Sequence, residues 1–196
     1  MKKSVFALVM ALVLLCGSAL ATGTGFTFTA EDYVAGYTQF CNDALQKEVV
    51  WSDPVDTDDG LTGVAGTAEG MNDVYVYTAQ GDTACAGMGT ELTVGLSDSE
   101  LTAKSQAFGT TVAAIPFASR YVELDNDIVA LSGDLQAIQD ACMTLVQNVF
   151  SSDAINTAIA DGSYSETAEV AGHTAQLKLV VDMDSMAMTV TFVFVP

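Results

Sequence analysis

The residues able to do chemistry are few, and the single histidine, His173, is the first of them. Schemes that pair a nucleophile with an imidazole base need this residue. The alternation of apolar residues around it predicts a different role, at the end of a strand on a buried sheet face opposite Phe194. We therefore interpret His173 as a residue closing the edge of the core, and as a weak ligand-binding candidate. Because hydrolase and phosphate-binding motifs are also missing from the sequence, no residue is assigned a catalytic role.

A turn rich in carboxylates is the second candidate for chemistry. Its acidic residues are Asp53, Asp56, Asp58 and Asp59. Their composition resembles a calcium loop, but with Gly60 in the sixth position of an EF-hand the first position would be Val55 and the twelfth Gly66. A solvated turn is the favoured interpretation, and a weak, irregular calcium site formed by these four aspartates is the alternative. No other cofactor is predicted.

Glu166 is the third candidate, because its place in the strand pattern is unusual. Its parity puts it on the apolar face opposite Leu177, where an unpaired carboxylate would cost several kcal/mol or take up a proton. A bulge, a position at the sheet edge, or a partner such as Tyr164 or Arg120 would resolve the conflict. Glu166 is therefore a weak ligand-binding candidate. A hydrolase using two carboxylates would need a second such residue, which the sequence does not identify.

The N-terminal residues have the pattern of a secretory signal. Met1-Lys2-Lys3 is basic, residues 5–15 form an apolar run of about half a bilayer span, and Ala19-Leu20-Ala21 offers small residues for cleavage. We predict a signal peptide over 1–21 and a single domain over 22–196. The alternative is a lipoprotein signal retaining Cys16, which the bulky residue before that cysteine disfavours. The predicted location is secreted, periplasmic or in the cell envelope, without a transmembrane anchor after cleavage.

The chain is strongly acidic, with 25 Asp and Glu against 6 Lys and Arg and a formal net charge of −19. Loss of Lys2 and Lys3 with the signal would bring the charge to −21. Such a chain is not expected to bind nucleic acid or anionic membranes, since both require basic residues. Three cysteines follow the predicted cleavage site, Cys41, Cys85 and Cys142, without a CxxC motif or zinc spacing. The spacing assigns no disulfide among them.

The first half of the chain reads as a helix, several strands and a second helix. Thr29 is typical of a helix cap, and apolar residues at helical spacing extend that helix to about Gln46. Strands are expected at 48–52, 61–69, 73–79 and 88–96, with a loop at 80–86 that carries Cys85. Ser97 and Glu100 form a capping box that opens the next helix, which Pro116 is expected to break or kink.

The second half reads as helices followed by a meander. One helix starts at Ser132 or Asp134, and another turn or two lies within 153–160. Strands are expected at 164–170, 173–182 and 186–194. A tight turn at Ala171-Gly172 pairs Val170 with His173, and a two-residue loop at Met183-Asp184 pairs Val181 with Met186. Both registers place the apolar side chains on one face.

This order of elements predicts an α+β fold, with an antiparallel sheet covered on one face by helices. The helix-then-meander order recurs over 29–97 and 132–196, which suggests a pseudo-repeat. The functional hypothesis is a bacterial, extracytoplasmic, non-catalytic binding domain whose partner is a macromolecule or a small ligand. The alternatives are a small exported hydrolase using acidic residues and a calcium-stabilised binding domain.

Overall fold

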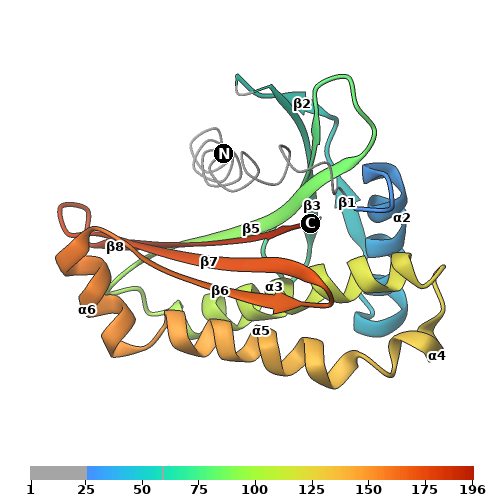
Figure 1. The fold of residues 1–196 in the computed structure, drawn as a ribbon. Coiled ribbons are helices and arrows are strands. Elements are labelled where there is room, and N and C mark those ends of the chain that lie inside the picture. The colour runs from blue at the N-terminus through green and yellow to red at the C-terminus, as the bar shows by residue number, and fades with distance from the viewer. Residues whose placement is uncertain (1–25, 59) are drawn as a thin grey trace.

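The computed structural model describes residues 26–58 and 60–196, so the predicted signal peptide and Asp59 lie outside the described residues. The chain forms an antiparallel sheet of eight strands with helices against one face (Figure 1), which confirms the predicted α+β fold. The elements are α2 (Ala30–Phe40), the π-helical turn η1 (Cys41–Leu45), β1 (Val49–Trp51), β2 (Val55–Asp56), β3 (Leu61–Ala68), β4 (Val74–Ala79), β5 (Cys85–Gly95), α3 (Leu101–Glu123), α4 (Ile128–Leu131), α5 (Leu135–Val149), α6 (Ser152–Asp161), β6 (Tyr164–Val170), β7 (His173–Asp182) and β8 (Ala187–Val195).

The strand order shows how the two halves of the chain meet. The order is β1-β3-β4-β5-β8-β7-β6, and the short β2 pairs with β3. Each half runs from helix to meander, so the predicted order recurs. The two meanders join through their last strands, β5 and β8, which pair from Met88 opposite Phe194 to Gly95 opposite Ala187.

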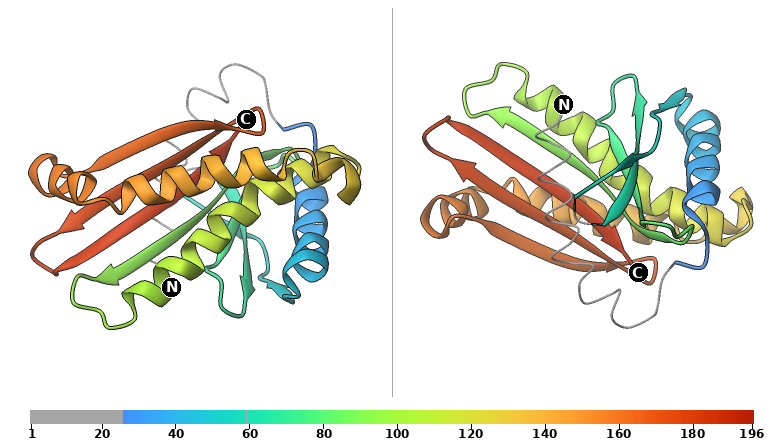
Figure 2. Two further views of the ribbon diagram at one scale, coloured as in Figure 1. Left: turned by 90° about the horizontal axis from the view of Figure 1, so that it is seen from below. Right: turned by 90° about the horizontal axis from the view of Figure 1, so that it is seen from above.

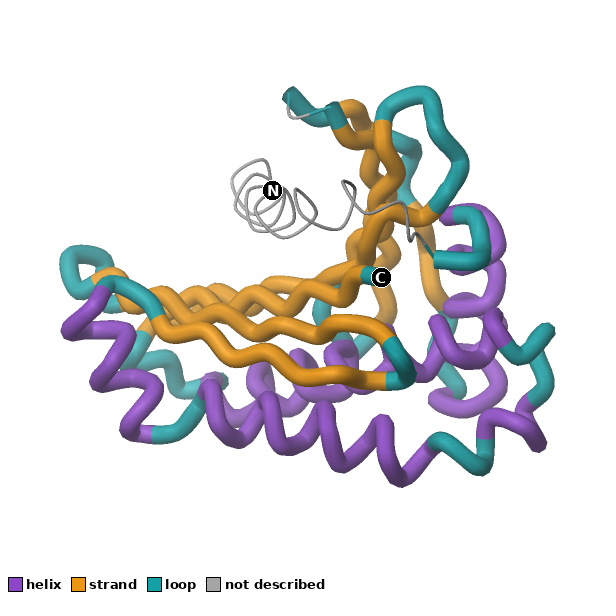
Figure 3. The backbone as a smooth tube through the Cα atoms, viewed as in Figure 1, coloured by secondary structure: helices purple, strands orange, loops and turns teal. Residues whose placement is uncertain are grey.

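The sheet is bent rather than flat. In Figure 3, β3 and β4 rise steeply from the plane of β6, β7 and β8, and the long β5 belongs to both parts. The register of β4 on β5 shifts between Tyr77 and Thr78, and such irregularities increase local twist. Helices α3, α5 and α6 lie beneath the flat part, and α2 stands beside the raised part (Figure 1).

The core lies between the sheet and the helices. Alternate residues of β7 and β8 point towards α3, α5 and α6, and Leu177, Leu179, Val190 and Phe192 are fully buried. The helices contribute Phe108, Val112, Ile115, Ile138, Cys142 and Leu145 to the same cluster. Burial of large apolar side chains stabilises each by about 1.5–3 kcal/mol, so this interface dominates the stability of the fold.

One predicted hairpin register is correct and the other is wrong. Val170 pairs with His173 across a tight turn, as predicted. In the second hairpin Val181 pairs with Met188 instead of Met186, because residues 183–186 form a four-residue loop. The Asp182 carboxylate closes this loop by accepting hydrogen bonds from the amides of Asp184 and Ser185. Since the error is two residues, the apolar sets still share one face.

Of the two predicted helix caps, that of α2 is confirmed and that of α3 is wrong. Thr29 and Asp32 cap α2 reciprocally, as a capping box requires. The predicted box at the start of α3 is absent. Instead, the Asp98 carboxylate accepts a hydrogen bond from the amide of Glu100 and binds Lys104 at 2.7 Å. β5 also starts earlier than expected, at Cys85, which had been placed in a loop.

Helix α3 continues through Pro116 to Glu123, so of the two expected outcomes the break is wrong, while a kink stays a prediction. Proline has no N–H, which frees the carbonyl of Val112 four residues earlier. The Cys142 thiol of α5 approaches that carbonyl at 3.9 Å. Packing of α5 therefore supplies a weak donor at the position where α3 lacks one.

Candidate functional site

His173 belongs to a network of hydrogen bonds at the end of α3, formed with Glu123, Arg120 and Asp134. Its Nε2 lies 2.5 Å from Oε1 of Glu123, and its ring packs on Phe26 and Phe194. The Arg120 guanidinium donates to Glu123 at 3.2 Å and to Asp134 at 2.6 Å. These contacts tie β7, α3 and the start of α5 together. His173 does contact Phe194, but the residue opposite Phe194 is Ala175, so the predicted pairing is wrong by the same two residues as the rest of the β7–β8 register. Its partner Glu123 was not predicted.

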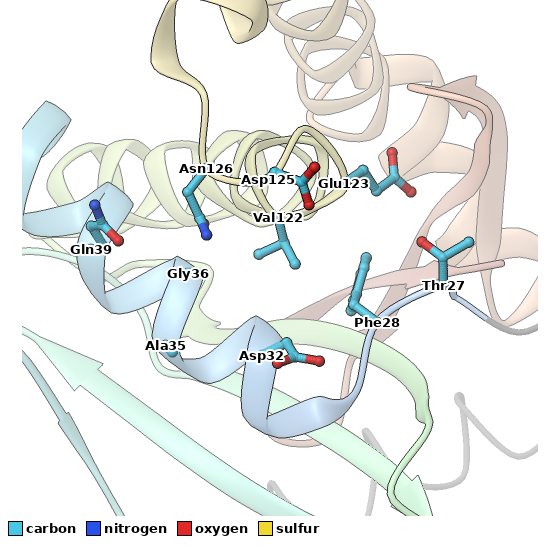
Figure 4. A pocket seen from close by; sticks show the side chains of 10 residues that line it. All are labelled: Thr27, Phe28, Asp32, Ala35, Gly36, Gln39, Val122, Glu123, Asp125 and Asn126. Atoms are coloured by element: carbon cyan, nitrogen blue, oxygen red, sulfur yellow. The ribbon is translucent and has the colours of Figure 1, made fainter.

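A polar hollow of about 400 Å³ lies beside this hydrogen-bond network, between α2 and the end of α3 (Figure 4). In Figure 4, Val122 points towards Gly36, and a Cβ built on that glycine would lie within 2.2 Å of the valine Cγ2. The hydroxyl and amide of Thr29 hold the pKa of Asp32 below its usual range. Glu123 is held by Arg120 and His173. The two carboxylates Asp32 and Glu123 thus already have partners within the chain.

The carboxylate of Glu166, which the sequence places on the apolar face of the sheet, is satisfied by hydrogen bonds. Its two carboxylate oxygens accept from Asn148 at 2.7 Å and from the Tyr164 hydroxyl at 3.0 Å. Tyr164 was one of the two predicted partners, while Arg120 binds elsewhere. The second contact raises the pKa of Tyr164. Glu166 therefore links β6 to α5, and it does not approach His173 in any described interaction.

The acidic turn is partly built into the sheet. Val55 and Asp56 form β2, and the Asp56 carboxylate accepts a hydrogen bond from Thr62 at 2.6 Å. Asp59 lies outside the described residues. Among the residues that the structure describes, no three His, Cys, Asp or Glu side chains gather as metal ligands would. Calcium binding by this turn stays a prediction.

The three cysteines among the described residues, Cys41, Cys85 and Cys142, are buried. Burial raises the pKa of Cys41 to about 11 and that of Cys142 to about 12. Thiols with such pKa values carry almost no thiolate near neutral pH and are poor nucleophiles and metal ligands. Cys85 lies with its sulfur 3.2 Å from that of Met88. All three act as packing residues.

The sheet face turned away from the helices carries a cluster that the sequence did not single out. Burial raises the pKa of Glu91 on β5 to about 7, although a hydrogen bond from Thr191 opposes the shift. Glu91 Oε2 and the Tyr77 hydroxyl are buried without a hydrogen-bond partner among the described residues. Burial and the negative charges of Asp73 and Glu91 raise the pKa of Tyr75 to about 12. The alternating pattern of β5 marked Glu91 as polar but gave no sign of this burial.

An apolar groove of about 960 Å³ separates α3 from α5 on the helical side of the molecule. From below, the two helices lie closest near α4 and diverge away from it, with strands visible between them (Figure 2, left). Phe117 and Leu135 line the end near α4. Phe150, Ile155 and Met188 line the wide end, where β8 contributes to the floor.

The lining of this groove is uncharged throughout. Its apolar members are supplemented by hydroxyl and amide side chains: Thr102, Ser105, Gln106, Thr110, Gln139 and Gln147. Met143 and Leu135 project into it with 50% and 39% of their surface exposed. Methionine adapts its shape to varied apolar partners. The arrangement can bind an apolar surface, and its lining contains no carboxylate, imidazole, thiol or cationic group.

Comparison with known proteins adds no assignment. The chain matches no family model, no curated protein and no solved structure. Among the described residues, no helix has the length and apolar character needed to cross a membrane.

Proposed function

We propose that the protein is an exported, non-catalytic binding domain that holds the apolar part of a partner in the α3–α5 groove. The observation that carries the proposal is the lining of the groove. Charged residues make up 16% of the chain, yet no charged residue lines this groove. Exposed apolar patches with polar rims commonly mark binding sites. Export rests on the N-terminal pattern over 1–21, and mass spectrometry of the secreted protein should find a chain beginning at Thr22.

A neutral solvatochromic dye such as Nile red tests the groove directly. Gly109 lies on α3 within the groove, and a Cβ added there would meet only Val146 Cγ1, at 3.9 Å. The substitution Gly109→Leu should therefore fill the groove without disturbing the core. We expect dye bound to the unaltered protein to fluoresce strongly, and the variant to lose at least tenfold in affinity.

The matched control is Ala103→Leu, which adds the same side chain to an exposed position of α3 outside the groove. This control should keep the affinity of the unaltered protein. Dye binding that survives Gly109→Leu, or no dye binding at all, would refute the proposal. Circular dichroism of both variants establishes that α3 remains folded.

A second candidate function, acid-assisted hydrolysis, has one observation in its favour. Glu91 is a carboxyl group with a pKa near 7, which suits a general acid. Burial alone raises the pKa of Asp73, which directly precedes the neighbouring strand β4, and neither shift includes repulsion between the two groups. Paired-carboxylate hydrolysis requires two groups about 5–10 Å apart acting together. Because no such coupled pair is found here, the binding function is the better supported.

A further inference from the structure

We infer that the occupant of the groove is an amphipathic α-helix of another polypeptide, about four turns long, with a basic outer side. This inference rests on the proposed function, because it names the partner of the same groove. It is supported by the length of the groove, by the sizes of the residues along it, and by the distribution of charge around it.

The length of the groove fits a helix. Its lining runs along α3 from Leu101 to Phe117 and along α5 from Leu135 to Phe150. At 1.5 Å per residue, each wall is about 24 Å long, which equals about four turns of a helix lying alongside. Partner helices bind such grooves through apolar residues at positions i, i+3 or i+4, and i+7. The volume of about 960 Å³ accepts the apolar side of such a helix, with its polar side left in water.

The α3 side of the groove has small side chains in its middle and large ones at its ends. Ser105, Gly109 and Ala113 follow at intervals of four residues, between the large Leu101 and Phe117. The distance between packed helices depends on the side chains at their contact, and small residues permit the closest approach. A helix can therefore lie against the middle of α3, with its apolar side chains directed towards Phe150, Met143 and Met188.

The rims suit a polypeptide better than a charged lipid. Gln106, Gln139 and Gln147 are exposed, and their side chains make no hydrogen bond to the rest of the described chain. Their amides can both donate to and accept from a peptide. A fatty acid or phospholipid would instead need a cation for its headgroup. The nearest candidate on α3, Lys104, is already bound by Asp98 at 2.7 Å and Glu100 at 3.5 Å.

The charge of the chain selects a basic partner. The carboxylates of Glu100, Asp140 and Asp153 are exposed and lie within two residues of the lining residues Leu101, Gln139 and Ile155. With a net charge of −19, the protein attracts a cationic segment and accelerates its association. A second copy of this chain carries the same charge and is repelled, which excludes it as the favoured occupant.

The test uses three synthetic 18-residue peptides. The first is a helix with leucine on one side and lysine on the other, the second replaces its lysines by glutamate, and the third scrambles the leucine–lysine sequence so that no apolar side forms. Displacement of Nile red and fluorescence anisotropy are measured at 150 mM and 500 mM salt. We expect the first peptide to displace the dye and to bind at least tenfold more tightly than the other two.

Two pairs of variants locate the binding. Gly109→Leu should weaken the leucine–lysine helix at least tenfold, and Ala103→Leu should not. Met143→Ser removes a half-exposed groove side chain, while Val129→Ser makes a similar change at a position of α4 that is 76% exposed. We expect several-fold weaker binding from the first of these and no change from the second. If Gly109→Leu fails to fold, the comparison of Met143→Ser with Val129→Ser still tests whether the peptide binds in the groove.

The outcomes separate the inference from the proposed function. Dye binding that depends on Gly109 without displacement by any peptide overturns the inference and leaves the proposed function standing. If the leucine–lysine helix and its scrambled version bind equally, and the groove variants do not change their binding, charge attraction alone explains the binding. That result also overturns the inference. Tighter binding of a neutral monoacylglycerol than of the helix assigns the groove to lipid. A dimer in sedimentation that Gly109→Leu dissociates assigns it to a second copy.

Discussion

Two hollows lie along α3, and they differ in what their side chains already bind. At the C-terminal end of the helix, the polar hollow contains carboxylates, but that of Asp32 accepts hydrogen bonds from Thr29, and that of Glu123 is held by Arg120 and His173. Along the N-terminal two thirds, the groove contains no charge, and its glutamine side chains and Met143 contact little of the chain. The comparison teaches that the carboxylates Asp32 and Glu123 of the polar hollow act structurally, because both are already bound within the chain. The uncharged hollow has surface available for a partner.

The largest expected effect comes from adding one methyl group at each hollow. At Gly36, beside the polar hollow, a Cβ would lie 2.2 Å from Val122 Cγ2. Valine is stiff about χ1, so α2 and α3 must separate, and we expect Gly36→Ala to reduce the free energy of unfolding by about 1–3 kcal/mol. At Gly109, in the groove, there is room, and Gly109→Ala should stabilise α3 by about 0.5–1 kcal/mol. Urea denaturation of both variants would contradict the comparison if the signs agreed.

The second prediction removes a charge from the polar hollow. Glu123→Gln keeps the size of the side chain but weakens the bonds to His173 and Arg120. Hydrogen bonds to charged groups contribute more than neutral ones, so we expect a loss of about 1–2 kcal/mol in the free energy of unfolding. Nile red binding in the groove should not change. The control is Asp125→Asn, which alters a carboxylate in the same hollow that makes no described side-chain hydrogen bond. Equal destabilisation by both substitutions would show that Glu123 has no structural role.

The third prediction sharpens the comparison with a carboxylate that lies in neither hollow. The pKa of Glu91 is about 7 when folded, against an ordinary value of 4.5. Because folding raises this pKa, its contribution to stability is fully present below about pH 4.5 and is lost as pH rises through 7. Glutamine resembles the protonated carboxyl group. We expect Glu91→Gln to match the unaltered protein in melting temperature at pH 4 and to exceed it at pH 8.

A control for this effect is Glu169→Gln on the exposed side of the edge strand β6. That variant should show little difference from the unaltered protein at either pH. A stabilisation by Glu91→Gln of the same size at pH 4 and pH 8 would mean that the charge of Glu91 is not the cause.

Local turn chemistry explains which parts of the sheet could be predicted. The β6–β7 register followed from Ala171-Gly172, where both residues adopt positive φ, as a two-residue hairpin turn requires. The β7–β8 register depended on the side chain of Asp182, which closes a longer loop and leaves Met186 outside the sheet, half exposed. The alternation of apolar residues determines which face of a strand is buried, but any shift by an even number of residues keeps that face. It therefore could not distinguish the predicted register from the observed one, which differs by two residues.

The candidate site was less predictable, because it depends on the distance between elements. Apolar residues recur at helical spacing in α3 and α5, which predicts one buried face on each helix, and the side chains that point at the sheet are in the core. The groove exists because the two helices diverge, which depends on the angle at which they cross. A local sequence pattern does not indicate that angle. Glu91 was missed for a related reason, since its burial depends on neighbouring strands. Glu166 and its partner Tyr164 were identified because they are two residues apart on one strand.

The position of β8 has a consequence for how the chain is made. It is the last of the described strands, yet it lies between β5 and β7. Until residues 187–195 have left the ribosome, the two meanders cannot join, and the inner edges of β5 and β7 are unpaired templates for aggregation. Contacts such as Leu92 with Val190 span half the chain, and long-range pairings of this kind form slowly. The two meanders therefore stay unjoined, and open to binding by chaperones, until β8 has left the ribosome.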